Sequence, residues 1–231
     1  MPDTKFNAHC RLMAFLPLYI YSIAISFLAS LLVYIRPKTS YFYLKLFPPF
    51  LLITLVVETL GSYLWSVGKN NVSLYNLFSV FEFLFYLFVI SLVISNTTMK
   101  KIIRSTAILY VIAALTNIFF IQKIKTFHTI TYSLGCLLIV VFCIYYFLEL
   151  FRQSKSIKLK NNSAFWICSA LLFFYCCGFP LYGLINYWSG ISKLLVRNFD
   201  GIVTILNIFL YSLFTVAFLC IKTRKYTLSP S

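Results

Sequence analysis

Seven long apolar runs constrain this chain more than any other feature of its sequence. A helix rises about 1.5 Å per residue, so about 20 apolar residues cross the roughly 30 Å hydrocarbon core of a bilayer. Backbone groups cannot stay unpaired in lipid, and an isolated run pairs them only as a helix. We therefore predict an all-α polytopic membrane protein with one transmembrane domain over residues 1–231. The spans are expected at about Leu12–Ile35, Lys45–Val67, Leu74–Ser95, Ile102–Ile121, Phe127–Phe151, Ala164–Trp188 and Phe199–Ile221.

The composition excludes a water-soluble globule. Of the 231 residues, 61% are apolar and only 11% are charged, whereas a soluble domain is about 25% charged. Lys5 and Arg11 precede the first run as they would in a signal peptide, but its roughly 24 apolar positions exceed the apolar region of such a peptide. We therefore expect the first helix to remain in the mature protein.

Basic residues are unevenly distributed between the two sides of the predicted membrane domain. Thirteen lie in the first, third and fifth loops and the C-terminal tail, and seven lie on the other side. The positive-inside rule places the richer side in the cytoplasm and the N-terminus outside, although Lys5 and Arg11 oppose this orientation. The thirteen are Arg36, Lys38, Lys45, Lys100, Lys101, Arg104, Arg152, Lys155, Lys158, Lys160, Lys222, Arg224 and Lys225.

The formal net charge of +15 arises from twenty Lys and Arg against five acidic residues. These basic residues form short clusters at the membrane edges rather than a continuous basic face, so nucleic acid is not an expected partner. Contact between anionic lipid and the cytoplasmic loops explains them better.

Seven cysteines lie almost wholly inside the apolar runs, and no Cys-x-x-Cys motif occurs. Only His9 and His128 could supply imidazole, so a zinc site lacks its ligands, and the odd number of cysteines argues against a disulfide framework. We expect no metal and no cofactor, and we interpret the cysteines as small apolar packing residues.

Two glutamates stand well inside predicted spans, where insertion of an acidic residue at a helix centre costs about 2.5–3.5 kcal/mol. Glu58 and Glu82 are equidistant from residue 70, in the turn Lys69-Asn70-Asn71. In an antiparallel hairpin they would face one another at the same depth, roughly 18 Å from the turn by helical rise. All Lys and Arg lie in loops, tails or helix ends, so neither carboxylate has an obvious cationic partner inside the membrane.

Several states stay open for these glutamates. The three alternatives are a protonated and hydrogen-bonded carboxyl group, a carboxylate that faces a water-filled cavity, and a carboxylate that coordinates a cationic ligand or ion. Each alternative avoids an unpaired charge in a low dielectric, which is costly. A structural role as neutral interhelical contacts is the competing interpretation.

Further polar residues share helix faces with one another, because positions three, four or seven apart lie on one side of a helix. Ser79 and Tyr86 lie on the Glu82 face, and Asp200, Thr204, Asn207 and Tyr211 form one face of the last run. Together with Asn117, His128 and Asn186 they outline a polar cavity open to the outside. The candidate ligand-binding residues are Glu58, Glu82, Ser79, Tyr86, Asn207, Tyr211 and Asp200.

The sixth run contains a candidate hinge. Pro180 lies between Gly178 and Gly183, and a proline inside a helix removes one backbone hydrogen bond and kinks the helix. Kinked membrane helices also occur without motion, so the hinge is a hypothesis beside that plainer interpretation.

A shift of 125 residues superimposes Ser79-x-x-Glu82-x-x-x-Tyr86 on Thr204-x-x-Asn207-x-x-x-Tyr211. Residues 12–95 and 127–221 are therefore a candidate parallel duplication, with 102–121 as the connector. This three-plus-one-plus-three plan is similar to that of SWEET-type and vitamin-uptake carriers, although the Pro-Gln pair of the sugar carriers is absent. The resemblance implies a small polar solute between two three-helix bundles, with Glu82 and Asn207 as contacts.

A second resemblance involves the hairpin Glu58-x-x-Gly61-x-x-x-Trp65 through Asn76-x-x-x-x-x-Glu82. It resembles uncharacterised bacterial seven-helix membrane proteins over about 25 residues and implies no activity. The bacterial inner (cytoplasmic) membrane is the expected location. A retinal pigment is excluded, because the last predicted helix has no lysine to form a Schiff base.

Three functions remain after these exclusions. The favoured one is an outward-facing polar cavity that binds or transports a small polar or cationic ligand through intramembrane carboxylates. The alternative is a membrane sensor or accessory subunit that acts through a membrane or cytoplasmic protein partner, with structural glutamates. An intramembrane enzyme ranks third, because no nucleophile–base pair, metal cluster or nucleotide loop occurs in the sequence.

Overall fold

The computed structural model describes residues 17–35, 41–122, 126–152, 159–183 and 193–220, with only the backbone for 193–197. Within these ranges all regular secondary structure is helical. Seven of the described helices are long and apolar enough to cross a membrane, which confirms the predicted multi-pass all-α architecture. They are α2 (Leu18–Ile35), α3 (Phe47–Ser66), α4 (Val72–Val93), α5 (Thr97–Thr116), α6 (Thr129–Arg152), α7 (Ser163–Gly183) and α8 (Lys193–Leu219). The short elements η1 (Phe42–Leu46), η2 (Asn117–Ile121) and η3 (Leu159–Asn161) lie beside helix ends.

Backbone chemistry accounts for both ends of α3. Pro48 and Pro49 stand in its first turn, where the backbone N–H groups have no intrahelical partner in any case. The helix ends just before Gly68, whose φ of 70° lies in the left-handed region that favours glycine. The turn predicted around residues 69–71 is therefore confirmed, since α4 begins at Val72.

The start of the last helix is the predicted boundary that differs most from the described structure, and the difference has a physical reason. The last helix begins at Lys193, nearly two turns before the predicted Phe199, because a helix continues through basic residues at the membrane edge where apolarity ends. The other parts of the predicted spans at residues 12–16, 184–188 and 221 lie outside the described ranges.

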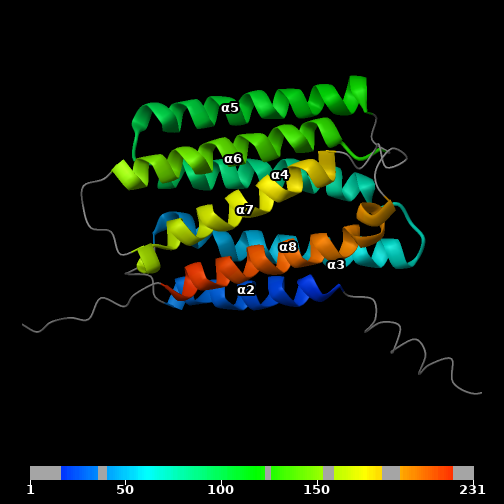
Figure 1. Cartoon of the computed structure of the whole chain (residues 1–231), viewed down its shortest axis with the longest axis horizontal. Helices are drawn as coiled ribbons and strands as arrows, with labels where there is room; N and C mark the ends of the chain where they lie inside the picture. Colours follow the sequence, from blue (N-terminus) through cyan, green and yellow to red (C-terminus); the bar gives the residue numbers. More distant parts are fainter. Residues whose placement is uncertain (1–16, 36–40, 123–125, 153–158, 184–192, 221–231) are drawn as a thin grey trace, which may run out of the picture.

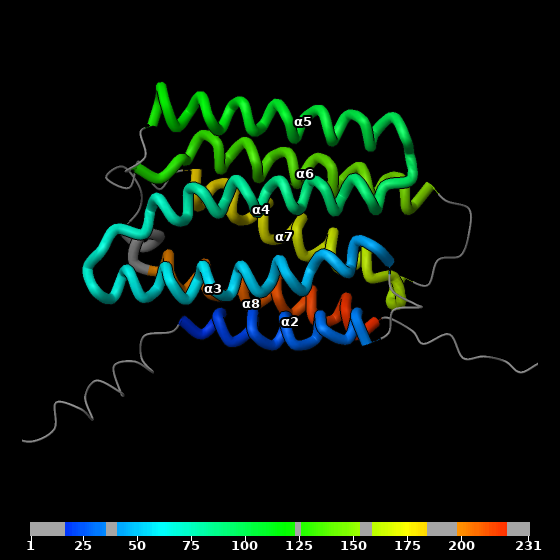
Figure 2. The backbone as a smooth tube through the Cα atoms, turned by 180° about the vertical axis from the view of Figure 1, so that it is seen from behind, coloured from blue at the N-terminus to red at the C-terminus, as the bar shows by residue number. Residues whose placement is uncertain are grey.

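The helices run side by side along the long axis of the molecule (Figure 1). α7 packs against both α6 and α8, and α8 also packs against α2, so the first and last described spans are neighbours. α5 lies at one edge and α2 at the opposite edge in both views (Figures 1 and 2). α3 packs far more against α2 than against α4, although a short turn joins α3 to α4.

Aromatic side chains fill much of the space between the helices. The ring of Phe47 on α3 meets those of Phe85, Phe214 and Phe218 edge to face, with centroids 5.3–5.4 Å apart. Each such pair adds about 0.5–1.5 kcal/mol beyond the burial of its surface. Three of the predicted packing cysteines are also buried in this core: Cys136, Cys143 and Cys168.

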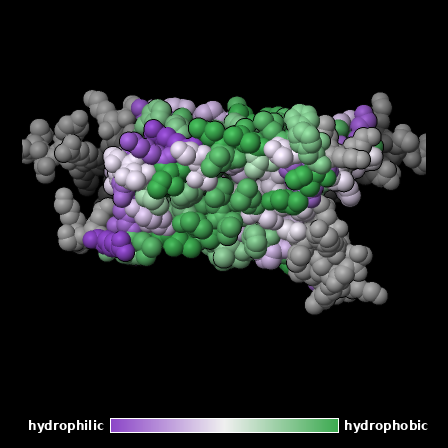
Figure 3. Space-filling view, turned by 90° about the horizontal axis from the view of Figure 1, so that it is seen from above, coloured by the Kyte–Doolittle hydropathy of each residue, from purple (hydrophilic) through white to green (hydrophobic). Residues whose placement is uncertain are grey.

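The surface in Figure 3 is apolar along the middle of the molecule and more polar toward both ends. Many large apolar side chains are exposed there, as expected for a face that contacts lipid rather than water.

Among the basic side chains that the structure describes, Lys69 lies at one end of the helices and six lie at the other. The six are Lys45, Lys100, Lys101, Arg104, Arg152 and Lys160.

Glu149 on α6 holds the start of α5. Its carboxylate accepts hydrogen bonds from the backbone N–H of Ser95 at 2.9 Å and of Asn96 at 2.8 Å. The Asn96 side chain in turn accepts from the backbone N–H groups of Thr98 and Met99, as an N-cap residue does. This acidic residue therefore has a structural role at the end with most of the basic residues.

Candidate functional site

The two intramembrane glutamates line the same cavity, which we call the inner cavity and which has a volume of about 240 Å³. Glu58 lies eight residues before the end of α3, and Glu82 lies ten residues after the start of α4. By helical rise these positions are about 12 and 15 Å from the helix ends, near the middle of each span. The inner cavity is lined by Tyr19, Glu58, Tyr75, Phe78, Ser79, Glu82, Phe127, Tyr132, Phe174, Tyr182, Val203, Asn207 and Tyr211.

The predicted site residues divide between this cavity and its surroundings. Ser79, Asn207 and Tyr211 line the inner cavity with the glutamates. Tyr86 does not line it and is fully buried in the core beside it. Asp200, at the start of α8, is exposed and lines a second cavity nearer the membrane edge.

Glu58 is held by two tyrosines from neighbouring helices. Its Oε2 atom accepts a hydrogen bond from the Tyr19 hydroxyl of α2 at 2.7 Å and another from the Tyr75 hydroxyl of α4 at 3.2 Å. The carboxyl group therefore links α2, α3 and α4. Gly61, one turn farther along α3, makes this arrangement possible, because a β-carbon there would stand 2.6 Å from the ζ-carbon of Tyr75.

Glu82 has a different environment. The hydroxyl groups of Tyr86 and Tyr175 lie beside its carboxyl group and are its nearest donors, yet neither makes a hydrogen bond of ordinary length and angle within the described part of the chain. The Glu82 side chain is only partly covered, since it faces the inner cavity. Of the two glutamates, Glu82 therefore has its carboxyl group open to a bound molecule.

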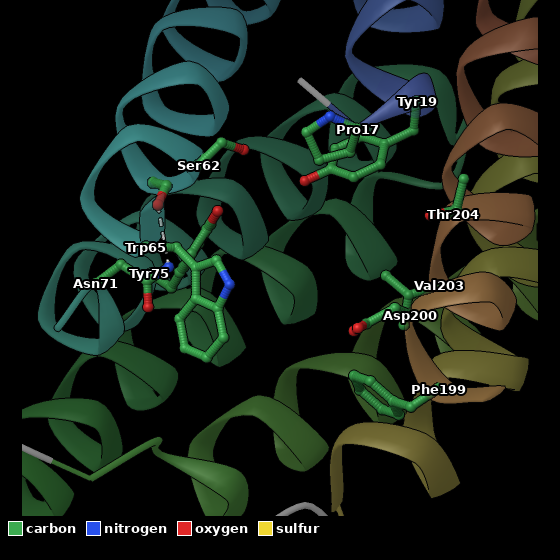
Figure 4. A pocket seen from close by; sticks show the side chains of 11 residues that line it. Pro17, Tyr19, Ser62, Trp65, Asn71, Tyr75, Phe199, Asp200, Val203 and Thr204 are labelled. Atoms are coloured by element: carbon green, nitrogen blue, oxygen red, sulfur yellow. Dashed lines mark hydrogen bonds between the residues drawn. The ribbon is translucent and has the colours of Figure 1, made fainter. Parts of the chain in front are cut away.

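A larger outer cavity of about 580 Å³ lies between the inner cavity and the end of the helices that carries Lys69. Its lining combines residues at the start of α2 and α8 with the end of α3 and the start of α4 (Figure 4). Tyr19, Tyr75 and Val203 line both cavities, so the two tyrosines that hold Glu58 stand at their common boundary. The other lining residues are Pro17, Gly61, Ser62, Trp65, Asn71, Phe199, Asp200 and Thr204.

Aromatic rings form one wall of the inner cavity. The rings of Tyr132 on α6 and Tyr182 on α7 are 4.7 Å apart between centroids. Phe127 lies 5.5 Å from the Tyr132 ring and 6.0 Å from the Tyr182 ring. The three rings are therefore in mutual contact and present a continuous aromatic surface.

Among the residues that the structure describes, the lining contains carboxylates but no Lys, Arg or His. Across the described ranges no group of three or more His, Cys, Asp or Glu is placed to hold a metal ion. The chemistry that this lining offers is hydrogen-bond acceptance, negative charge and contact with aromatic rings.

Two other residues that were predicted to outline the cavity, Asn117 and His128, are not among the lining residues of either cavity. Asn76 donates from its side chain to the carbonyl of Thr126 at 2.8 Å, and its Oδ1 accepts the His128 backbone N–H at 3.0 Å. Asn117 donates to the Thr131 hydroxyl at 2.5 Å. Asn117 and His128 therefore belong to a polar network that joins α4, η2 and α6, while Asn186 lies outside the described residues.

The candidate hinge lies at the cavity end of α7. The helix continues through Pro180 to Gly183, and Gly178 is buried within it. A β-carbon on Gly183 would stand 2.9 Å from the Ser133 hydroxyl of α6. Motion about this segment stays a prediction.

Sequence reasoning did not select Tyr19, Tyr132 or Tyr182 as site residues. Tyrosines near the ends of apolar runs are ordinary interfacial anchors, and this composition contains seventeen of them. The seven-residue spacing of Tyr75 and Glu82 on one helix face was the signal available for Tyr75. A tyrosine on another helix gives no comparable signal.

Comparison with known protein families, with curated proteins and with solved structures finds no match for this chain.

Proposed function

We propose that this protein binds or transports a small polar or cationic ligand in the inner cavity through the carboxyl groups of Glu58 and Glu82. The observation that carries the proposal is the partly open Glu82 carboxyl group inside a membrane span, in a cavity whose described lining residues include no basic side chain. Such a carboxylate is costly in a low dielectric unless a donor or a cation reaches it. A ligand with donor groups or positive charge supplies that partner.

We further propose that the cavities open to the outside of a bacterial inner membrane. Among the described positions, six basic residues lie at the opposite end of the helices and three, Lys69, Lys193 and Arg197, lie at this end, and the positive-inside rule assigns the richer end to the cytoplasm. In this orientation the ligand enters the outer cavity past Asp200, and passes the boundary formed by Tyr19 and Tyr75 to reach Glu82.

The alternative function is a membrane sensor or accessory subunit that acts through a protein partner. The two tyrosine hydrogen bonds to Glu58 favour it, because they give that carboxyl group a structural role without any ligand. Under this alternative, a protein partner remains associated whether or not the glutamates are changed.

Native mass spectrometry of the protein in mild detergent tests the proposal. We expect the wild type to carry a discrete small-molecule or ion adduct, and Glu82→Gln to lose it while folding normally. The matched control is Glu149→Gln, which makes the same chemical change on α6 away from both cavities and is expected to keep the adduct. A stoichiometric protein partner retained by all three forms, with no small adduct in any, would overturn ligand binding in favour of the alternative.

A further inference from the structure

We infer that the ligand of the inner cavity is a small organic ammonium ion. This inference rests on the proposed function and narrows it to one chemical class. Three properties of the lining carry it: the large share of aromatic rings, the imbalance between acceptors and donors, and the size of the cavity.

The aromatic share is the first property. Eight of the thirteen lining residues are Phe or Tyr, and they come from α2, α4, α6, α7, α8 and the segment before α6. The face of an aromatic ring attracts a cation within about 6 Å of its centre, and surrounding rings are the usual means of binding a substituted ammonium group. The contacting rings of Phe127, Tyr132 and Tyr182 form such a surface.

The balance of hydrogen-bonding groups is the second property. Two carboxyl groups offer acceptors, whereas four side-chain donors of the lining are already used within the protein. Tyr19 and Tyr75 donate to Glu58, Ser79 donates to the carbonyl of Asn76, and Asn207 donates to the carbonyl of Val203. The donors that remain are the hydroxyls of Tyr132, Tyr182 and Tyr211 and the second N–H of the Asn207 amide. An anion or a sugar needs many more donors, and a positively charged ligand needs acceptors.

The metal-ion alternative fits less well. Calcium takes about six to eight oxygen ligands and magnesium requires a near-octahedral set. The described residues contain no group of three or more metal-binding side chains. Most of the lining residues are aromatic, and the oxygen atoms that five of them carry are neutral phenol hydroxyls rather than the carboxylates and carbonyls that these cations prefer.

The volume of about 240 Å³ bounds the size of the ligand. A water molecule takes a share of about 30 Å³ in the liquid, so the cavity has room for roughly eight water-sized groups, that is, for a ligand of about eight non-hydrogen atoms. Drug-sized ligands occupy cavities of about 300–1,000 Å³. Tetramethylammonium, choline and short alkylamines fit within this bound.

The test measures binding of choline to the purified full chain in lipid nanodiscs by isothermal titration calorimetry. Its control ligand is 3,3-dimethylbutan-1-ol, which has the shape of choline with carbon in place of the charged nitrogen. We expect saturable binding of choline and none of the neutral alcohol. This comparison uses only the wild-type protein, so it stands whether or not any variant folds.

Two variants assign the binding to the inner cavity. Glu82→Gln is expected to lower choline affinity at least tenfold. Tyr182→Leu is expected to lower it about three- to thirtyfold, while Tyr182→Phe, which keeps the ring, retains it. Equal binding of choline and its neutral analogue would overturn the inference.

The outcomes separate this inference from the proposed function. A neutral or metal adduct that depends on Glu82, with no choline binding, would refute the ammonium ligand and leave the binding site in place. Absence of any Glu82-dependent adduct and of choline binding would refute both.

Discussion

The contact between Gly135 and Phe83 allows a direct test of the packing beside the inner cavity. Gly135 lies on α6, and a β-carbon there would stand 2.6–2.7 Å from three atoms of the Phe83 ring on α4. Ordinary carbon contacts are about 3.5–4.0 Å, so the ring must move by about 1 Å in Gly135→Ala. The ring is fully buried, and the rings of Tyr110, Tyr132 and Tyr175 surround it with centroids 5.7, 5.2 and 5.2 Å away.

Two opposing effects determine how much Gly135→Ala changes the free energy of unfolding. Overpacking a filled core costs about 1–3 kcal/mol, because neighbouring side chains leave their preferred positions. Alanine has a higher helix propensity than glycine, which contributes up to about 1 kcal/mol in the opposite direction. We therefore expect Gly135→Ala to lower the free energy of unfolding by about 1–2 kcal/mol.

The assay is reversible unfolding in mixed micelles of a mild detergent and SDS, followed by circular dichroism. The matched control is Gly178→Ala on α7, where a β-carbon would lie at an ordinary 3.7 Å from the Tyr182 ring. This control should be as stable as the wild type or slightly more stable. A Gly135→Ala protein that is at least as stable as Gly178→Ala would refute the reasoning, because it would mean that the Phe83 ring moves freely.

Two further substitutions test single contacts of the fold and the site. Gly61→Ala would bring a β-carbon against the Tyr75 hydroxyl and displace this hydroxyl from Glu58. We therefore expect ligand affinity in the calorimetric titration to fall about two- to tenfold. An unchanged affinity would contradict a role for the hydrogen bond from Tyr75 to Glu58. Glu149→Gln replaces a charged acceptor of the Ser95 and Asn96 N–H groups. We expect the free energy of unfolding to fall by about 1–2 kcal/mol with unchanged ligand affinity. An SDS unfolding midpoint equal to that of the wild type would contradict this structural role of Glu149.

The sequence was sufficient to predict the spans because the bilayer makes one demand on every crossing segment. Each must be apolar over about 20 residues and must pair its own backbone. The turn between Glu58 and Glu82 was predictable as well, since the polar residues near Asn70 separate two such runs. Helix ends were less predictable, as the early start of α8 at Lys193 illustrates, because basic residues at a membrane edge are compatible with both helix and loop.

Site residues that share a face of one helix could be predicted from the sequence, whereas contacts between residues of different helices could not. The spacing of Ser79, Glu82 and Tyr86 identifies one face of α4, yet Tyr86 points into the core while Ser79 lines the cavity. Which tyrosine reaches Glu58 depends on how α2 packs against α3, and no local pattern specifies that packing. Tyr19 was therefore beyond the reach of sequence reasoning, although it donates the shorter of the two hydrogen bonds to Glu58.

The two glutamates meet the cost of a buried carboxyl group in different ways. Glu58 receives two hydroxyl donors from α2 and α4, so its hydrogen bonding does not depend on a ligand. The two tyrosine hydroxyls beside Glu82, those of Tyr86 and Tyr175, make no hydrogen bond of ordinary length and angle within the described residues. On the inference that the ligand is an ammonium ion, that ion supplies Glu82 with a close, charged donor. Glu58 then has a structural role in addition to its place in the cavity, whereas Glu82 serves the ligand. Removal of the Glu58 carboxyl group should weaken helix packing as well as ligand binding, and removal of the Glu82 carboxyl group should weaken ligand binding alone.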